Sequence, residues 1–443
     1  MNHTETLWVQ NIGSCLSCHA ELPKRGPDLS DPGLIRGIDM VIRDGIIRYM
    51  GPNGHQYLDE IKQTGAPSGD HPEHGADPGL TVYDAGGRTV IPGLIDAHTH
   101  LVFAGERANE FYWRASGKSY QAIQQEGGGI RRTMTETRRA SPEELIEQAL
   151  FFLGQAFRAG TTTMEVKSGY GLDYDNELKI LQVIEKLNQL QPVELIPTFL
   201  GAHIHPPDCS ASDYMDQLLN RMLPDFRRYC QRCDIFLDRG AFSRRETELY
   251  FVKALSLEYR LMAHLNQLED LGGIALIHHF PIDSMDHLEI LSDRDAEILA
   301  ESETVGIFLP IAEMVLHHPD PGAYRKLRDA GGLVSLATDF NPGSAPCFSI
   351  PILMHLAALR YGIGFAEILN SVTLQAAFAL REHDRIGSLH PGKQADLIIL
   401  DLKNPEVLPY FPGTDFIRAV IKNGRLYPSE HRPHSDHRAN PFF

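Results

Sequence analysis

The sequence has few cysteines and no long apolar run, and each of these absences excludes a class of protein. Six cysteines in 443 residues are too sparse for a disulfide scaffold, which favours a reducing compartment. The first ten residues lack the basic start and apolar stretch of a secretory signal. No segment reaches the roughly 18 consecutive apolar residues that a membrane span needs. We therefore predict a cytoplasmic protein with no membrane partner.

Positive charge is also scarce. Lys and Arg number 41 against 58 Asp and Glu, which gives a net charge of −17 and disfavours nucleic acid and anionic lipid as partners. Apolar residues make up 42% and charged residues 22%, which excludes the disordered, collagen-like and coiled-coil classes. We expect a globular protein whose partner is a small molecule.

Both ends of the chain contain β-hairpin signals. Residues 37–49 alternate apolar and polar positions around Asp44-Gly45, and a second turn signal, Asn423-Gly424, lies within 419–426. The two ends are therefore expected to form one small β-sandwich domain. Residues 51–79 are rich in Gly, Pro, Asp and His without periodicity, which predicts a solvated excursion between strands.

The middle of the chain alternates short apolar runs with segments of helical periodicity, which is typical of βα units around a parallel sheet. In one unit, Ser141 as N-cap, Pro142 and Glu144 predict a helix start, and Gly160 predicts its end. Eight strands are predicted, at 91–100, 161–168, 194–203, 233–242, 261–265, 284–289, 304–310 and 334–340. Eight strands can close a barrel. The predicted fold is α/β: a (β/α)8 TIM-like barrel over 92–387 and a composite β-sandwich domain from 1–91 and 388–443.

Polar residues at the ends of these strands indicate chemistry, because the active site of such a barrel lies where its strands end. His98 and His100 are two residues apart on the first strand and so project to one face. His264 ends the fifth strand, His287 the sixth and Asp339 the eighth. Imidazoles with a carboxylate suit zinc or iron and leave a coordination position for water, whose pKa would fall towards about 7.

These residues lie within longer blocks that resemble the amidohydrolase superfamily over nearly the whole chain. The blocks are 92–110 (PGLIDAHTHLVFAGERANE), 127–131 (GGGIR), 165–173 (EVKSGYGLD), 198–203 (TFLGAH), 286–289 (DHLE), 337–344 (ATDFNPGS) and 384–396 (DRIGSLHPGKQAD). The first and last blocks are typical of the superfamily, and the others of members that open a five-membered cyclic amide bearing a propionate. The resemblance implies hydrolysis of 4-imidazolone-5-propanoate to N-formimidoyl-L-glutamate.

The resemblance also implies a role for each matching residue. The implied metal ligands are His98, His100, His264 and Asp339, and the implied catalytic residues are His287, beside the bound water, and Asp339, which would pass a proton. One ion per subunit, zinc or iron, is expected, because two-metal relatives bridge their ions through a lysine ending the fourth strand and 233–242 contains none.

A second set of residues matches substrate-contacting positions of the family. Arg107 would bind the substrate carboxylate, and Gln267 occupies a position that contains Glu or Gln in this family. The implied substrate-binding residues are Arg107, Tyr120, Tyr170, His203, Gln267, Asn341, Gly343 and Ser344. A homodimer is compatible with the resemblance, although no helix face in the sequence establishes one.

Three residues depart from the family pattern, and two other functions stay open. Ile311 and His205 stand where smaller residues are usual, and Arg239 stands where an acid is more frequent. The same metal site could deaminate a cyclic amidine such as guanine, and a non-catalytic interaction protein could use the same scaffold. A Cys-x-x-Cys-His match at residues 15–19 suggests haem attachment, but that chemistry requires export.

Overall fold

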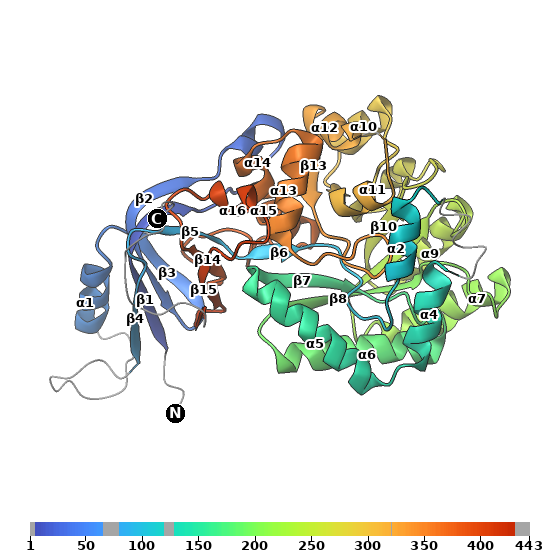
Figure 1. Cartoon of the computed structure of the whole chain (residues 1–443), viewed down its shortest axis with the longest axis horizontal. Helices are drawn as coiled ribbons and strands as arrows, with labels where there is room; N and C mark the ends of the chain where they lie inside the picture. The colour runs from blue at the N-terminus through green and yellow to red at the C-terminus, as the bar shows by residue number, and fades with distance from the viewer. Residues whose placement is uncertain (1–4, 65–78, 119–127, 320, 430–443) are drawn as a thin grey trace.

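Two sheets organise the chain (Figure 1), which a computed structural model describes over residues 5–64, 79–118, 128–319 and 321–429. One sheet is a parallel barrel surrounded by helices, and the other is built from both ends of the chain. This is the α/β architecture that the strand pattern predicts. The domain boundaries near residues 92 and 387 stay a prediction.

The barrel sheet contains eight parallel strands in sequential order, one for each predicted strand. Its strands are β6 (Leu94–Asp96), β7 (Thr161–Lys167), β8 (Glu194–Ala202), β9 (Arg232–Leu237), β10 (Arg260–Leu265), β11 (Ile282–His287), β12 (Val305–Phe308) and β13 (Leu333–Leu336). Past the ends of β6 and β13, a parallel bridge between Thr99 and Phe340 brings the first and last strands together. The barrel is therefore nearly closed, and it closes at its carboxyl end.

Helices follow the strands and cover the outside of the barrel (Figure 1). They are α2 (Ala108–Ala115), α4 (Ile130–Arg139), α5 (Pro142–Arg158), α6 (Tyr174–Leu190), α7 (Ala211–Gln217), α8 (Leu223–Phe226), α9 (Arg244–Ser256), α10 (Asp293–Ala300), α11 (Pro310–Val315), α12 (Gly322–Asp329), α13 (Ile350–Tyr361), α14 (Phe365–Ser371) and α15 (Leu374–Ala379). Helix α5 begins with the predicted capping box of Ser141 and Glu144 and is followed by Gly160 at a φ of +95°. No helix in the described part of the chain is long and apolar enough to cross a membrane.

The second sheet joins the two ends of the chain and has a hydrophobic core of its own. Its strands are β1 (Thr6–Leu16), β2 (Leu34–Arg43), β3 (Ile46–Gly51), β4 (Leu80–Asp84), β5 (Thr89–Pro92), β14 (Leu397–Leu400), β15 (Ile417–Lys422) and β16 (Arg425–Pro428). Both predicted hairpins are present, β2–β3 around Asp44-Gly45 and β15–β16 around Asn423-Gly424. Strand β5 pairs with both β1 and β14, so the first and last segments of the chain meet there.

The prediction of an aperiodic excursion at residues 51–79 is wrong in part. Helix α1 (Gly54–Thr64) lies within 51–79, where the sequence predicts an aperiodic excursion. The ring of Tyr57 stacks on Tyr49 of β3 at 4.8 Å, and the backbone N–H of Gly54 donates to Asp39 of β2. These contacts come from strands outside the segment, so the local sequence could not show them. Residues 65–78 lie outside the described residues.

Candidate active site

Barrel closure brings the polar ends of the first and last strands together. The backbone N–H of Asp339 donates to the carbonyl of His98 (3.0 Å), and the N–H of His100 donates to the carbonyl of Phe340 (2.9 Å). As a result, Oδ1 of Asp339 lies 3.4 Å from Nε2 of His98 and 3.5 Å from Nε2 of His100. Three of the four predicted metal ligands thus lie within one cluster, although Asp339 is more than 200 positions from His98 and His100 in the sequence.

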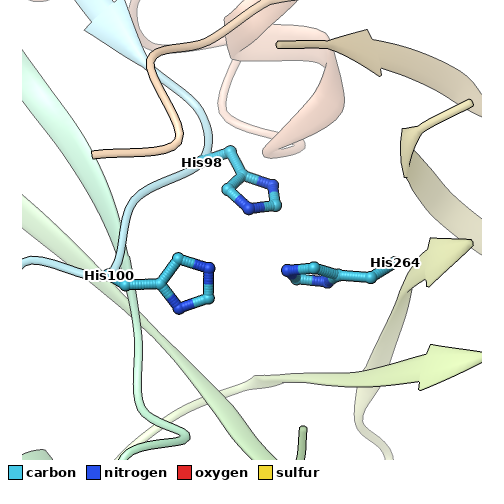
Figure 2. Close-up of side chains that lie close together, drawn as sticks. All are labelled: His98, His100 and His264. Atoms are coloured by element: carbon cyan, nitrogen blue, oxygen red, sulfur yellow. The ribbon is translucent and has the colours of Figure 1, made fainter. Parts of the chain in front are cut away.

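The fourth predicted ligand, His264 at the end of β10, completes this cluster. Figure 2 shows the rings of His98, His100 and His264 pointing toward one another, and one nitrogen from each lies within 4.8 Å of the other two. All three side chains are buried, yet Nε2 of His98 and Nε2 of His264 have no hydrogen-bond partner. Buried polar atoms are rarely left unpaired. Buried imidazole nitrogens that converge on one point are the donor set that fits a metal ion.

The electrostatic surroundings keep these imidazoles neutral. Burial lowers the pKa of His98 and of His100 well below the usual value, and it lowers the pKa of His264 as well. A neutral imidazole has the free lone pair that a metal requires, whereas a protonated one does not. The cluster is therefore in its metal-binding form at neutral pH.

His287, at the end of β11, has the opposite character. Its ring centre lies 5.4 Å from that of His264, and its Nδ1 lies 3.1 Å from Oε1 of Glu289. Burial alone would lower the pKa of His287, but the carboxylates of Glu289, Asp339 and Asp286, Glu289 foremost, outweigh it and raise the pKa to about 9. His287 therefore stays protonated at neutral pH and can donate a hydrogen bond. Burial raises the pKa of Asp339 to about 7, despite the nearby His287.

The predicted carboxylate-binding residue, Arg107, lies beside the segment that follows Asp339. A Cβ added to Gly343 would lie 2.2 Å from Nη1 of Arg107, so the guanidinium rests directly on this glycine. Nε of Arg107 donates to Glu110 (2.9 Å). Oδ1 of Asn341 accepts from the N–H groups of Gly343 and Ser344, and Oγ of Ser344 donates to Oδ2 of Asp339 (3.3 Å). These predicted residues form one continuous wall.

Tyr170 and His203 lie beside His100. The ring of His203 stacks on His100 at 5.2 Å, and the ring of Tyr170 lies 5.7 Å from each of them. Gln267 lies in the loop after β10, where its backbone N–H donates to Oδ2 of Asp238 (2.8 Å). Tyr120 lies outside the described residues.

The sequence prediction missed a layer of charged residues beneath the histidines. Nδ1 of His98 lies 2.7 Å from Oδ2 of Asp286, and Nδ1 of His264 lies 3.0 Å from Oδ2 of Asp234. Strand β9 has no lysine, as expected, but β7 ends with the buried Lys167. The available signal was a set of charged residues inside short strands, with Glu165 and Lys167 two positions apart and so on one face of β7.

The three departures from the family pattern have ordinary partners. Ile311 is buried in α11, Nε2 of His205 lies 3.3 Å from Oε1 of Glu246, and Nε of Arg239 lies 3.8 Å from Oε2 of Glu269. None of these contacts involves a predicted metal ligand.

The haem interpretation of the Cys-x-x-Cys-His match finds no support, because both thiols are buried. Burial raises the pKa of Cys15 to about 12 and that of Cys18 to about 11. Such thiols stay protonated and unreactive. All six cysteines of the chain are free.

Comparisons with known proteins agree with this geometry. The model of the Amidohydrolase family matches residues 89–427. An imidazolonepropionase from Herpetosiphon aurantiacus is 41% identical over 437 residues, covering 96% of this chain and 98% of its own. An imidazolonepropionase from Bacillus velezensis is 39% identical over 422 residues, covering 94% and 96%. Among solved structures, E. coli guanine deaminase superposes with a TM-score of 0.69 at 18% identity, covering 97% of this chain and 100% of that one, which shows a shared fold.

Proposed function

The chain belongs to the amidohydrolase family, and we propose that it hydrolyses 4-imidazolone-5-propanoate to N-formimidoyl-L-glutamate in histidine degradation. The observation that carries the proposal is the convergence of the buried ring nitrogens of His98, His100 and His264 beside Asp339, with Nε2 of His98 and Nε2 of His264 unpaired. The names of relatives at 39% and 41% identity support this substrate over other cyclic amides and amidines.

Members of this family depend on a metal, and the residues of the cluster fit one. We propose one ion per subunit, zinc or iron, held by His98, His100, His264 and Asp339, since imidazole and carboxylate ligands serve both metals. When bound, such an ion polarises a carbonyl oxygen and lowers the pKa of water towards about 7.

The remaining steps belong to the side chains. His287, protonated through its contact with Glu289, would donate a hydrogen bond to the oxygen of the ring carbonyl as negative charge develops there. Oδ2 of Asp339 would accept a proton from the attacking water and deliver it to the ring nitrogen. A carbon–oxygen bond forms and the ring carbon–nitrogen bond breaks, which leaves a carboxylate and the formimidoyl nitrogen.

The guanidinium of Arg107 and the polar wall formed by Asn341, Gly343 and Ser344 would set the position of the substrate. We propose that Arg107 binds the propionate carboxylate, because its guanidinium lies against the wall that leads to Asp339. The other proposed substrate contacts are Tyr120, Tyr170, His203, Gln267, Asn341, Gly343 and Ser344. The cytoplasmic location, which six free thiols support, and the homodimer stay predictions.

The test is incubation of metal-replete protein with freshly generated imidazolone propionate, with formimidoyl-glutamate and ammonia measured separately. We expect formimidoyl-glutamate without ammonia, and no product after chelator treatment. Intact substrate would contradict the proposal, and ammonia release from guanine in the same assay would favour deamination instead.

A further inference from the structure

Lys167 is a completely buried lysine beneath the candidate active site. It ends β7, and its side chain is fully excluded from solvent. Its Nζ lies 3.0 Å from Oε1 of Glu165, 2.9 Å from Oδ2 of Asp234 and 3.3 Å from Oδ2 of Asp286. These carboxylates come from β7, β9 and β11, so one ammonium group joins three barrel strands.

Two of these carboxylates each contact a different histidine of the cluster. Oδ2 of Asp286 lies 2.7 Å from Nδ1 of His98, and Oδ2 of Asp234 lies 3.0 Å from Nδ1 of His264. In both cases the oxygen near the histidine is also the one near Nζ of Lys167. A carboxylate at Nδ1 orients the ring and leaves Nε2 free to face an ion.

The third carboxylate, that of Glu165, holds the backbone between His98 and His100. Oε2 of Glu165 accepts from the N–H of Thr99 (3.3 Å), and Oγ1 of Thr99 donates to the Glu165 carbonyl (2.6 Å). Thr99 lies between His98 and His100, so fixing its backbone fixes the spacing of both rings. All three histidines therefore connect to Lys167 through one carboxylate each.

We propose that Lys167 is a positioning residue, which holds the three histidines in metal-binding geometry by anchoring Asp234, Asp286 and Glu165. Buried carboxylates without a cation would repel one another and turn away from the histidines. The ammonium also lies between Asp234 and Asp286, which with His264 would otherwise form a second candidate cation site. The inference rests on the metal site of the proposed function but not on its substrate.

The test compares Lys167→Met with a matched control, Lys422→Met. Lys422 is also buried and also pairs with two carboxylates, Glu194 (3.0 Å) and Asp396 (2.7 Å), but neither of them contacts a histidine of the cluster in the described part of the chain. For each purified, folded protein, the zinc dissociation constant is measured by chelator competition. The absorption spectrum of the cobalt-loaded protein reports ligand geometry.

We expect Lys167→Met to bind zinc about 10- to 100-fold more weakly, with an altered cobalt spectrum. Lys422→Met should keep wild-type zinc affinity and the wild-type spectrum while its Tm falls. A Lys167→Met protein that binds zinc within twofold of wild type and has an unchanged cobalt spectrum would overturn the inference, however much its Tm falls.

If Lys167→Met does not fold, Asp234→Asn decides in the same assay, because it keeps the side-chain shape but weakens the link between Lys167 and His264. Wild-type zinc affinity in Asp234→Asn would then overturn the inference. Failure of the wild-type protein to bind zinc, iron or cobalt would overturn the proposed metal site and this inference together. Tight zinc binding by the wild type without turnover of imidazolone propionate would count against the proposed function alone.

Discussion

Two buried lysines of this protein hold carboxylates at opposite ends of the barrel strands. Lys422 joins the terminal sheet to Glu194, the first residue of β8, whereas Lys167 lies at the end of β7, beneath the three histidines. Around Lys422 the carboxylates have further protein donors: Arg385 donates to Glu194 (2.5 Å), and the N–H of Asn423 donates to Asp396 (2.8 Å). Around Lys167 the connections end at histidine nitrogens without partners.

This difference separates a structural network from a functional one. A buried polar network whose members are satisfied by the protein stabilises and specifies the fold. A network that ends in several unpaired atoms, all facing one point, is incomplete without a ligand. Similar residue types therefore have different roles, and the unpaired atoms distinguish them.

The largest expected effect comes from removing a metal ligand from the network around Lys167. His264→Ala should lose the metal and reduce turnover to the level of chelator-treated protein, because the ion loses one of its four proposed ligands. Metal content by elemental analysis and product formation check this. Lys422→Met is the control and should retain metal and turnover. Equal metal loss in the control would contradict the difference in role between the two lysine networks.

The next effect separates substrate binding from metal binding. Arg107→Ala should retain the metal and raise KM by about 10- to 100-fold, since hydrogen bonds to charged groups contribute about 1.5–3 kcal/mol. Steady-state kinetics on metal-replete protein measure this. Arg385→Ala in the terminal network should lower Tm without changing KM, and metal loss in Arg107→Ala would refute the assignment of roles.

A smaller effect should follow from crowding Arg107 rather than removing it. Gly343→Ala places a methyl group where the arginine lies, so the guanidinium must shift, and KM should rise by about tenfold. Gly93→Ala is a matched control, because its methyl group would approach Thr162 at 2.2 Å, at the start of the barrel strands. The control should lose Tm but keep KM, and an unchanged KM in Gly343→Ala would contradict the placement of Arg107.

The smallest expected effect is a dependence of stability on pH, which arises from Glu194 in the network around Lys422. Burial alone would raise the pKa of Glu194, but Arg385 and Lys422 outweigh it and lower the pKa to about 2 from an ordinary 4.5. Glu194 should therefore stabilise the fold fully above about pH 4.5 and lose this contribution as the pH falls towards 2. The effect is modest because 30% of the side chain remains exposed.

Unfolding of wild type and Glu194→Gln by urea between pH 7 and pH 3 tests this expectation. Wild type should be the more stable protein at pH 7, and the gap should narrow below about pH 4.5. A gap that is constant with pH would show that Glu194 does not contribute through its charge.

Much of the molecule followed from local sequence. The eight barrel strands, the capping box of α5 and both turns of the terminal hairpins depend on residues near one another in the chain, so periodicity and capping chemistry predict them. Helix α1 was missed because its packing partners, Tyr49 and Asp39, lie outside its segment. The positions of His98, His264 and Asp339 at strand ends were likewise visible, because strand ends can be recognised locally.

The sequence by itself determined the fold class, the family and which side chains end the barrel strands. Only the tertiary structure decided how those side chains are held. The contacts of Lys167 with Asp234 and Asp286 join residues 67 and 119 positions apart, and no local pattern links them. Register and closure of the barrel set these distances, because each strand places its buried charges at a depth fixed by hydrogen bonds to its neighbours.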